Sequence, residues 1–241
     1  MYDPRQRPVA LRLLAAGFTI AEVHRQTGVP KSTLGYWKKH PEKAASRTPP
    51  LCPRCHDRAV DPAAYSYLLG LYLGDGHLAR QHNGVYRLEI ACSDAWPGLI
   101  DAAAEAVGTV LSSRVGRRQN SKHWPCLFPQ HGPGAKHTRK IELEGWQREI
   151  VDARTEEFVR GLIHSDGCRV INRVRKRLRG GDRWYEYPRY NFANVSLDIQ
   201  RMFTGALDRL GVEWTQMNAR NVSVAKREAV ARLDGFVGPK Y

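Results

Sequence analysis

The stretch that decides the fold runs Leu68-Leu69-Gly70-Leu71-Tyr72-Leu73-Gly74-Asp75-Gly76. It recurs as Val159-Arg160-Gly161-Leu162-Ile163-His164-Ser165-Asp166-Gly167. Both copies hold Gly-Leu, three further residues and then Asp-Gly, and the two aspartates are 91 residues apart. One such match could arise by chance, but two copies with similar sequence patterns after them indicate an internal duplication.

The small residues of both copies have a physical role on a helix. Gly70 and Gly74 are four apart and share one face, as do Gly161 and Ser165, so two helix backbones can approach closely. Each helix is expected to end at Asp-Gly, with the glycine in the left-handed conformation. Packed side by side, the helices would bring two carboxylates to one place. Paired carboxylates bind Mg²⁺, which can activate water and stabilise a leaving phosphate oxygen.

The segments after each copy predict the same order of elements. The first copy is followed by strand-like runs, a helix and two more strand-like runs, at 77–80, 85–92, 94–107, 109–117 and 123–128. The second is followed by the corresponding segments 169–179, 184–194, 197–210, 212–217 and 221–225. Turns are expected at His82-Asn83-Gly84 and Gly180-Gly181. The predicted fold is α+β, with helix-strand-strand-helix-strand-strand occurring twice.

Arginine recurs at alternate positions after the second copy. One face of the expected strand carries Arg169, Arg173, Arg175, Arg177 and Arg179. The partner strand offers Arg183, Tyr185, Tyr187 and Arg189, and Glu186 is expected on the opposite face. This pattern predicts a DNA-binding surface. The ribbon after the first copy, with Arg80, Arg87 and Arg117, shows a weaker form of it.

The overall charge points to the same class of partner. The chain has 38 Lys+Arg against 24 Asp+Glu, a formal net charge of +14, and 28 of the basic residues are arginine. A strongly basic chain is typical of polyanion binders, and arginine can bind phosphates and guanine edges in a bidentate way. A base-rich composition inherited from a GC-rich genome is the alternative, which the clustering of arginines disfavours.

The first forty residues predict a helix-turn-helix. Thr19-Ile20-Ala21-Glu22 has the pattern of a capping box, and Gly28 suits a tight turn before a helix at 31–39. Leu34 and Trp37 should face inward. The outward residues are predicted to contact DNA as a recognition helix would, and they are Lys31, Ser32, Thr33, Tyr36 and Lys38. A small helical packing module without a DNA role is the alternative.

A proline-rich segment with a Cys-x-x-Cys motif follows. Cys52 and Cys55 supply half of a tetrahedral zinc site, and His56, Cys92, Cys126 and His131 are the candidates for the missing ligands. A pair of free thiols in a loop is the alternative, and a redox role lacks a thioredoxin-like context.

Residues 65–235 resemble single-chain, two-repeat LAGLIDADG homing endonucleases in both motifs and in the order of elements that follows. The resemblance implies a DNA-binding saddle and cleavage of both strands of double-stranded DNA with Mg²⁺ or Mn²⁺, one aspartate serving each strand. The implied metal site comprises Asp75, Asp166, Gly74 and Ser165. The resemblance also implies basic side chains near the cleaved phosphates, for which Lys226, Lys136 and Lys122 are candidates. Both copies depart from the motif at its first aspartate, where Leu73 and His164 stand.

The sequence thus predicts a helix-turn-helix domain at 1–40, a linker at 41–63, and two repeats at 64–150 and 151–241. Two other functions remain open, a DNA-binding transcription regulator that does not cut and an RNA maturase. The longest apolar run, 65–73, is too short for a membrane span, and residues 1–7 lack an apolar signal core. A location in the bacterial cytosol, associated with the nucleoid, is therefore expected. The two-repeat resemblance implies a monomer with internal pseudo-twofold symmetry.

Overall fold

The computed structural model describes residue 3 and residues 6–46, 52, 54, 59–111, 119–179 and 181–240. The chain divides into two compact units, Met1–Arg58 and Ala59–Tyr241. Within the described residues no helix combines the length and the apolar character that crossing a membrane requires.

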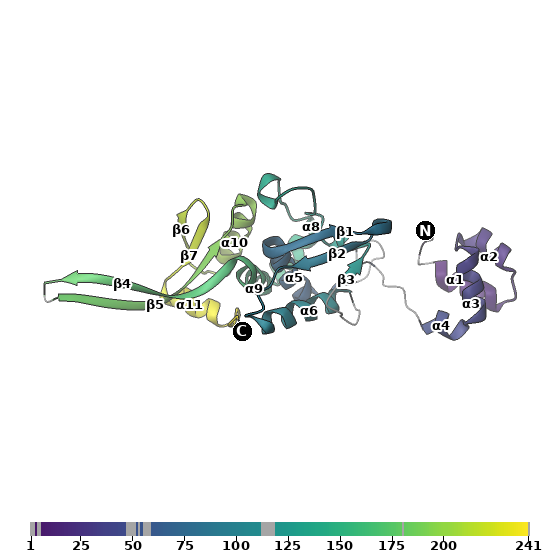
Figure 1. The fold of residues 1–241 in the computed structure, drawn as a ribbon, viewed down its shortest axis with the longest axis horizontal. Helices are drawn as coiled ribbons and strands as arrows, with labels where there is room; N and C mark the ends of the chain where they lie inside the picture. Colours follow the sequence, from purple (N-terminus) through teal and green to yellow (C-terminus); the bar gives the residue numbers. More distant parts are fainter. Residues whose placement is uncertain are drawn as a thin grey trace. The chain divides into compact units, whose positions relative to one another are not determined.

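The first unit is helical, with α1 (Gln6–Ala15), α2 (Ile20–Thr27), α3 (Lys31–Lys39) and α4 (Pro41–Ser46) (Figure 1). The capping box is confirmed, because Thr19 and Glu22 exchange hydrogen bonds. Gly28 ends α2 with φ of +66°, a conformation that favours glycine. Leu34 and Trp37 are buried, as the sequence predicted.

Helix α4 lies in the segment that the sequence assigned to the linker. The side chain of Arg7, on α1, donates a hydrogen bond to the carbonyl of Ala44 and lies 5.3 Å from the centre of the Trp37 ring. These contacts join helices that are distant in the sequence, so local sequence patterns do not reveal them.

The second unit is α+β. Its helices are α5 (Pro62–Asp75), α6 (Pro97–Leu111), α7 (Trp124–Leu127), α8 (Gly145–Ala153), α9 (Thr155–Asp166), α10 (Leu197–Arg209) and α11 (Arg227–Asp234), with short 3-10 turns η1 (His82–Gly84) and η2 (Lys136–Thr138). One antiparallel sheet contains β1 (Gly76–Arg80), β2 (Tyr86–Ile90) and β3 (Gln119–Ser121), in that order. The other has the order β4-β5-β7-β6 and contains β4 (Gly167–Leu178), β5 (Gly181–Ala193), β6 (Thr215–Asn218) and β7 (Asn221–Val224). The β4–β5 ribbon extends beyond the helices of this unit (Figure 1).

Helices α5 and α9 carry the two copies of the motif and pack against each other through their small residues. A Cβ atom built on Gly70 would lie 2.6 Å from the carbonyl oxygen of Phe158 and 2.9 Å from the Cα of Gly161. A Cβ on Gly161 would overlap the carbonyl oxygen of Tyr67. The close approach expected from the four-residue spacing is therefore confirmed.

The expected left-handed glycines at the ends of these helices are wrong. Gly76 has φ −84° and ψ 147°, and Gly167 has φ −109° and ψ 167°, so both are extended. Each helix passes directly into a strand at this residue. Glycine is needed at this position because a larger side chain would not fit: a Cβ on Gly167 would lie 2.8 Å from the Cα of Ile163.

The expected strand over 123–128 is also wrong, because residues 124–127 form α7. Pro125 lies in the first turn of this helix, where its missing amide hydrogen does no harm. Trp124, Leu127 and Phe128 are fully buried, so tertiary packing overrides their strand propensity. Of the other expected strand, residues 109–111 belong to α6 and residues 112–118 lie outside the described residues. Helices α8 and α11 were not expected.

The helix contact predicts unequal effects of two glycine substitutions. Gly161→Ala places a methyl group against the backbone of α5 and should destabilise the protein by about 3 kcal/mol, an overpacking cost. Gly205→Ala in α10 is the matched control, because nothing lies within 4 Å of its Cβ position, and it should be neutral or stabilise by up to about 1 kcal/mol. Urea unfolding measures both, and equal effects would contradict the packing.

Candidate functional site

Two carboxylates meet at the ends of α5 and α9. Asp75 ends α5 and Asp166 ends α9. Burial raises the pKa of Asp166 to about 6, and the charge of Asp75 adds to this effect. The pKa of Asp75 is raised too, chiefly because the surrounding protein displaces water, although its side chain retains an exposed surface. A Cβ atom built on Gly74, the residue before Asp75, would lie 3.1 Å from Asp166 Cγ, so the packed helices bring the ends that carry the two carboxylates close together.

Two lysines flank this pair and bind the carbonyl ends of the same two helices. Lys136 Nζ donates to the carbonyl oxygens of Leu73 (3.0 Å) and Gly74 (2.7 Å), and also to that of Tyr72. Lys240 Nζ donates to the carbonyl oxygens of Gly167 (2.6 Å) and Ser165 (3.4 Å). A cation is favourable at a helix C-terminus, where carbonyl groups lack partners within the helix.

Burial lowers the pKa of Lys136 to about 8, while the charges of Asp166 and Asp75 oppose that shift. Burial also lowers the pKa of Lys240, again against the pull of nearby acidic groups, the two aspartates among them. Both ammonium groups therefore act on both carboxylates. The site contains two negative and two positive groups in partial burial.

A cavity of about 400 Å³ opens beside Asp166. Its lining includes Lys136, Arg139, His77 and His131. Burial lowers the pKa of His131, and His77 and Arg139 lower it further, so the surroundings favour the neutral imidazole. Polar and cationic groups thus surround one side of the carboxylate pair, an arrangement that suits an anionic ligand such as a phosphate.

Asn194 fixes the orientation of the second carboxylate. Its Nδ2 donates to Asp166 Oδ2, and its Oδ1 accepts from the amide of Ser196 at 2.7 Å. The sequence analysis missed Asn194, Lys240 and His77. The position of Asn194 directly after a strand was the one available signal. Lys240 lies far along the chain from both motifs, and only the folded chain brings it to them.

Four of the residues predicted for the site are thus in one place, namely Asp75, Asp166, Lys136 and the Gly74 backbone. Ser165 lies beside them, and its hydroxyl donates to the carbonyl oxygens of Gly161 (3.1 Å) and Leu162 (3.0 Å) of its own helix. Lys226 is elsewhere: it precedes α11, and its ammonium pairs with Glu213. Among the described residues, the lysines that act on the carboxylates are Lys136 and Lys240.

The register of the β4–β5 ribbon separates its basic residues into two rows. Arg173 is opposite Glu186, Arg175 is opposite Trp184 and Arg177 is opposite Asp182, so these residues share one face. On the other face Lys176 is opposite Arg183, and Asn172 is opposite Tyr187. The expectation that Glu186 lies on the face away from the arginines is therefore wrong, because it assumed a register one residue different.

The two rows differ in charge. We call Arg169, Arg173, Arg175 and Arg177 the ion-paired row: Arg169 pairs with Asp234 at 2.8 Å, Arg173 with Glu186 at 3.2 Å, and Arg175 with Asp182. This face continues into Phe192, which stacks on Phe203 of α10, and so it is the helix side of the sheet. The opposite face carries what we call the open row, which has no acidic residue in either strand: Asn172, Lys176, Arg183, Tyr185, Tyr187 and Arg189.

The remaining predicted DNA contacts are on the surface. In the first sheet Arg80 is exposed and Arg87 pairs with Glu89, while Arg117 lies outside the described residues. Arg179, at the end of the ribbon, is exposed. On α3, Lys31, Ser32, Tyr36 and Lys38 are exposed and Thr33 is partly so.

Among solved structures, a point mutant of I-SmaMI is similar to this chain. It matches with a TM-score of 0.38 and 11% sequence identity, over 71% of this chain and 82% of that chain. No protein-family model and no curated protein matches the chain.

The raised pKa of Asp166 predicts how the site binds a divalent cation. Carboxylate oxygens are ligands for Mg²⁺ and Ca²⁺, and a cation would relieve the repulsion within the pair. At pH values below about 6 the cation must displace a proton from Asp166. The ionised fraction of this carboxyl falls from about a half at pH 6 to about a tenth at pH 5, so affinity for the cation should fall about fivefold over that range. Calorimetry with Ca²⁺ measures this. Affinity that is constant over that range, where an ordinary aspartate stays ionised, would contradict the shift.

Proposed function

We propose that this protein is a site-specific, Mg²⁺-dependent endonuclease for double-stranded DNA, of the type that the LAGLIDADG resemblance implies. The observation that carries the proposal is the meeting of Asp75 and Asp166 at the ends of two packed helices, with basic groups around them. A purely structural helix pair would gain nothing from two repelling carboxylates in partial burial, since their desolvation costs free energy.

Asp75 and Asp166 are the residues that would hold Mg²⁺, which when bound activates water and stabilises the leaving oxygen. Asn194 orients the Asp166 carboxylate through its hydrogen bond. Lys136 has a pKa of about 8 and is largely protonated at pH 7, so its positive charge would attract a phosphate beside the pair. Lys240 donates to the corresponding carbonyl end of α9 and would take the role that the resemblance suggested for Lys226.

The sheet would bind DNA through its open row. Lys176, Arg183 and Arg189 face away from the helices without acidic neighbours on their face. Arg183 and Arg189 lie over the rings of Tyr185 and Tyr187, at 5.4 Å and 6.0 Å, within the range of cation–π attraction. The acids beside the ion-paired row would repel phosphates, so that row is the weaker candidate.

The first unit would add DNA contacts as a helix-turn-helix, through the exposed residues of α3. This unit also favours a second function, a DNA-binding regulator that does not cut. A separate DNA-binding unit would be as useful to a transcription regulator as to a nuclease. The two functions differ in what they require of the aspartates.

Replacing either aspartate tests the proposal. In Asp75→Asn or Asp166→Asn the side chain keeps its size and loses the charge that Mg²⁺ requires. Double-strand cleavage of a selected site should fall at least about 100-fold in either variant, with only nicking left, since a metal contributes several kcal/mol to the transition state. Affinity for the same site in EDTA should stay constant or rise.

Asp101→Asn is the matched control, because Asp101 is an exposed carboxylate on α6. It should cut like the wild type. The contrary outcome has two parts: the wild type binds its site tightly but does not cut it with any of the metals tried, and both aspartate variants bind DNA and regulate transcription like the wild type. The protein would then be a regulator.

The salt dependence of DNA binding distinguishes the two rows. Replacing Lys176 and Arg183 by Gln should reduce the slope of log affinity against log salt by roughly 1.8, about 0.9 for each phosphate that is no longer neutralised. The control, Arg173→Gln with Glu186→Gln, removes an ion pair without changing net charge and should leave the slope unchanged. If the control reduces the slope as much, the ion-paired row is the DNA-binding surface.

A further inference from the structure

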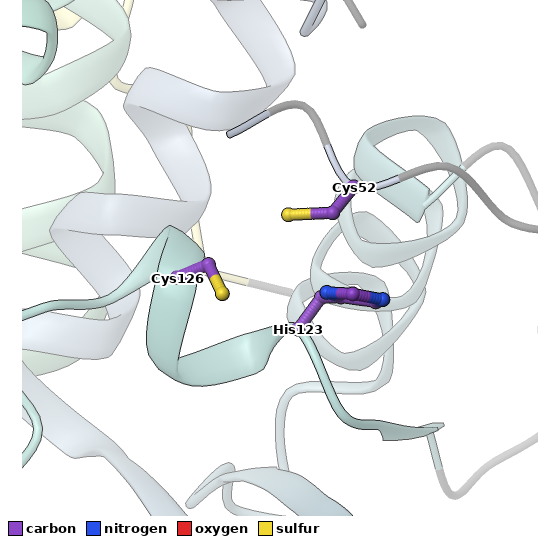
Figure 2. A group of neighbouring side chains, drawn as sticks. All are labelled: Cys52, His123 and Cys126. Carbon is purple, nitrogen blue, oxygen red and sulfur yellow. The ribbon is translucent and has the colours of Figure 1, made fainter. Parts of the chain in front are cut away.

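Three side chains of types that can bind a metal lie close together, namely Cys52, His123 and Cys126 (Figure 2). Each offers one ligand atom, and these atoms all lie within 4.8 Å of one another. Cys52 is buried and the other two are partly buried. In a tetrahedral zinc site, bonds of 2.0–2.3 Å place ligand atoms about 3.6 Å apart. Shifts of these three side chains by about 1 Å would therefore bring their ligand atoms to the distances of a zinc site.

The sequence supplies a fourth ligand. Cys52 and Cys55 form a Cys-x-x-Cys motif, and His123 and Cys126 form a His-x-x-Cys motif at the start of α7. Cys55 lies outside the described residues. Two pairs of ligands with two residues between the members of each pair are typical of structural zinc sites, and three cysteines with one histidine form a common ligand set.

We propose that Cys52, Cys55, His123 and Cys126 bind one structural Zn²⁺. With four protein ligands the metal would have no open position, so it would not take part in catalysis. Its role would be to fasten the segment before α5 to α7. Helix α7 is only four residues long, and the Tyr65 hydroxyl of α5 donates to the carbonyl oxygen of Leu127 at 2.5 Å. The metal would therefore brace the helix that carries Asp75.

Of the other candidate ligands from the sequence, His56 lies outside the described residues, and His131 and Cys92 belong elsewhere. His131 lines the cavity beside Asp166. Cys92 lies close enough to Asp75 and Lys240 for both charges to act on its thiol, and burial raises its pKa. Cys92 and Cys168 carry free thiols, which makes them matched controls for the loss of a cysteine.

The test is the metal content of the full chain, produced without a metal-binding tag and measured by elemental analysis. The wild type should contain about one zinc per chain. Each of Cys52→Ser, Cys55→Ser, Cys126→Ser and His123→Ala should reduce the zinc content by more than half, whereas Cys92→Ser and Cys168→Ser should retain it.

Titration of the metal-free full chain with Co²⁺ keeps the proposal testable if a ligand variant fails to fold. Bound Co²⁺ should show thiolate-to-metal charge-transfer absorption and the intense visible bands of a tetrahedral site, and one equivalent of Zn²⁺ should abolish them. This spectrum also separates the site from Asp75 and Asp166, which offer only oxygen ligands. A wild type with less than about a tenth of a zinc per chain, or a Co²⁺ spectrum without thiolate absorption, would overturn the proposal.

Discussion

The close contact between α5 and α9 is the constraint on which the second unit depends. Gly70 and Gly161 allow the two backbones to approach to a separation at which a Cβ atom would collide with main-chain atoms. Packing of this kind involves rigid backbones, so it fixes the relative position of the two helix ends and of the strands that continue from them. This one interface determines the positions of both carboxylates and of both sheets.

Bringing two carboxylates together costs free energy, and the surrounding residues offset part of it. Lys136 binds carbonyl oxygens at the end of α5, and Lys240 binds carbonyl oxygens at the end of α9. The positive charges of both lysines also stabilise the ionised aspartates. The lysines do not offset the whole cost of burying the carboxylates, since the pKa of Asp166 still lies near 6. Binding of a divalent cation, as we propose, would relieve the repulsion that folding imposes.

The sequence predicted the features that depend on local spacing. The small residues of the motif, the capping box at Thr19 and the two antiparallel ribbons all follow from residues close together in the chain. The predictions from the sequence were wrong where contacts between residues far apart in the chain determine the structure. The segment 124–127 forms a helix because Trp124 and Phe128 are buried, with Trp124 stacked on Phe128 and Phe128 stacked on Tyr72 of α5. The face of Glu186 depends on the register between two long strands. Lys240 and Asn194 likewise reach the site only in the folded chain, so no motif could have identified them.

The most direct test of the central claim is cleavage of a randomised library of double-stranded DNA, with binding selection in EDTA run beside it. The account predicts that Mg²⁺ or Mn²⁺ yields one family of sites cut on both strands, and that the same sites are selected for binding in EDTA. A library that yields tightly bound sites but no cut under any metal condition would contradict it, because the carboxylate pair would then have no role in hydrolysis.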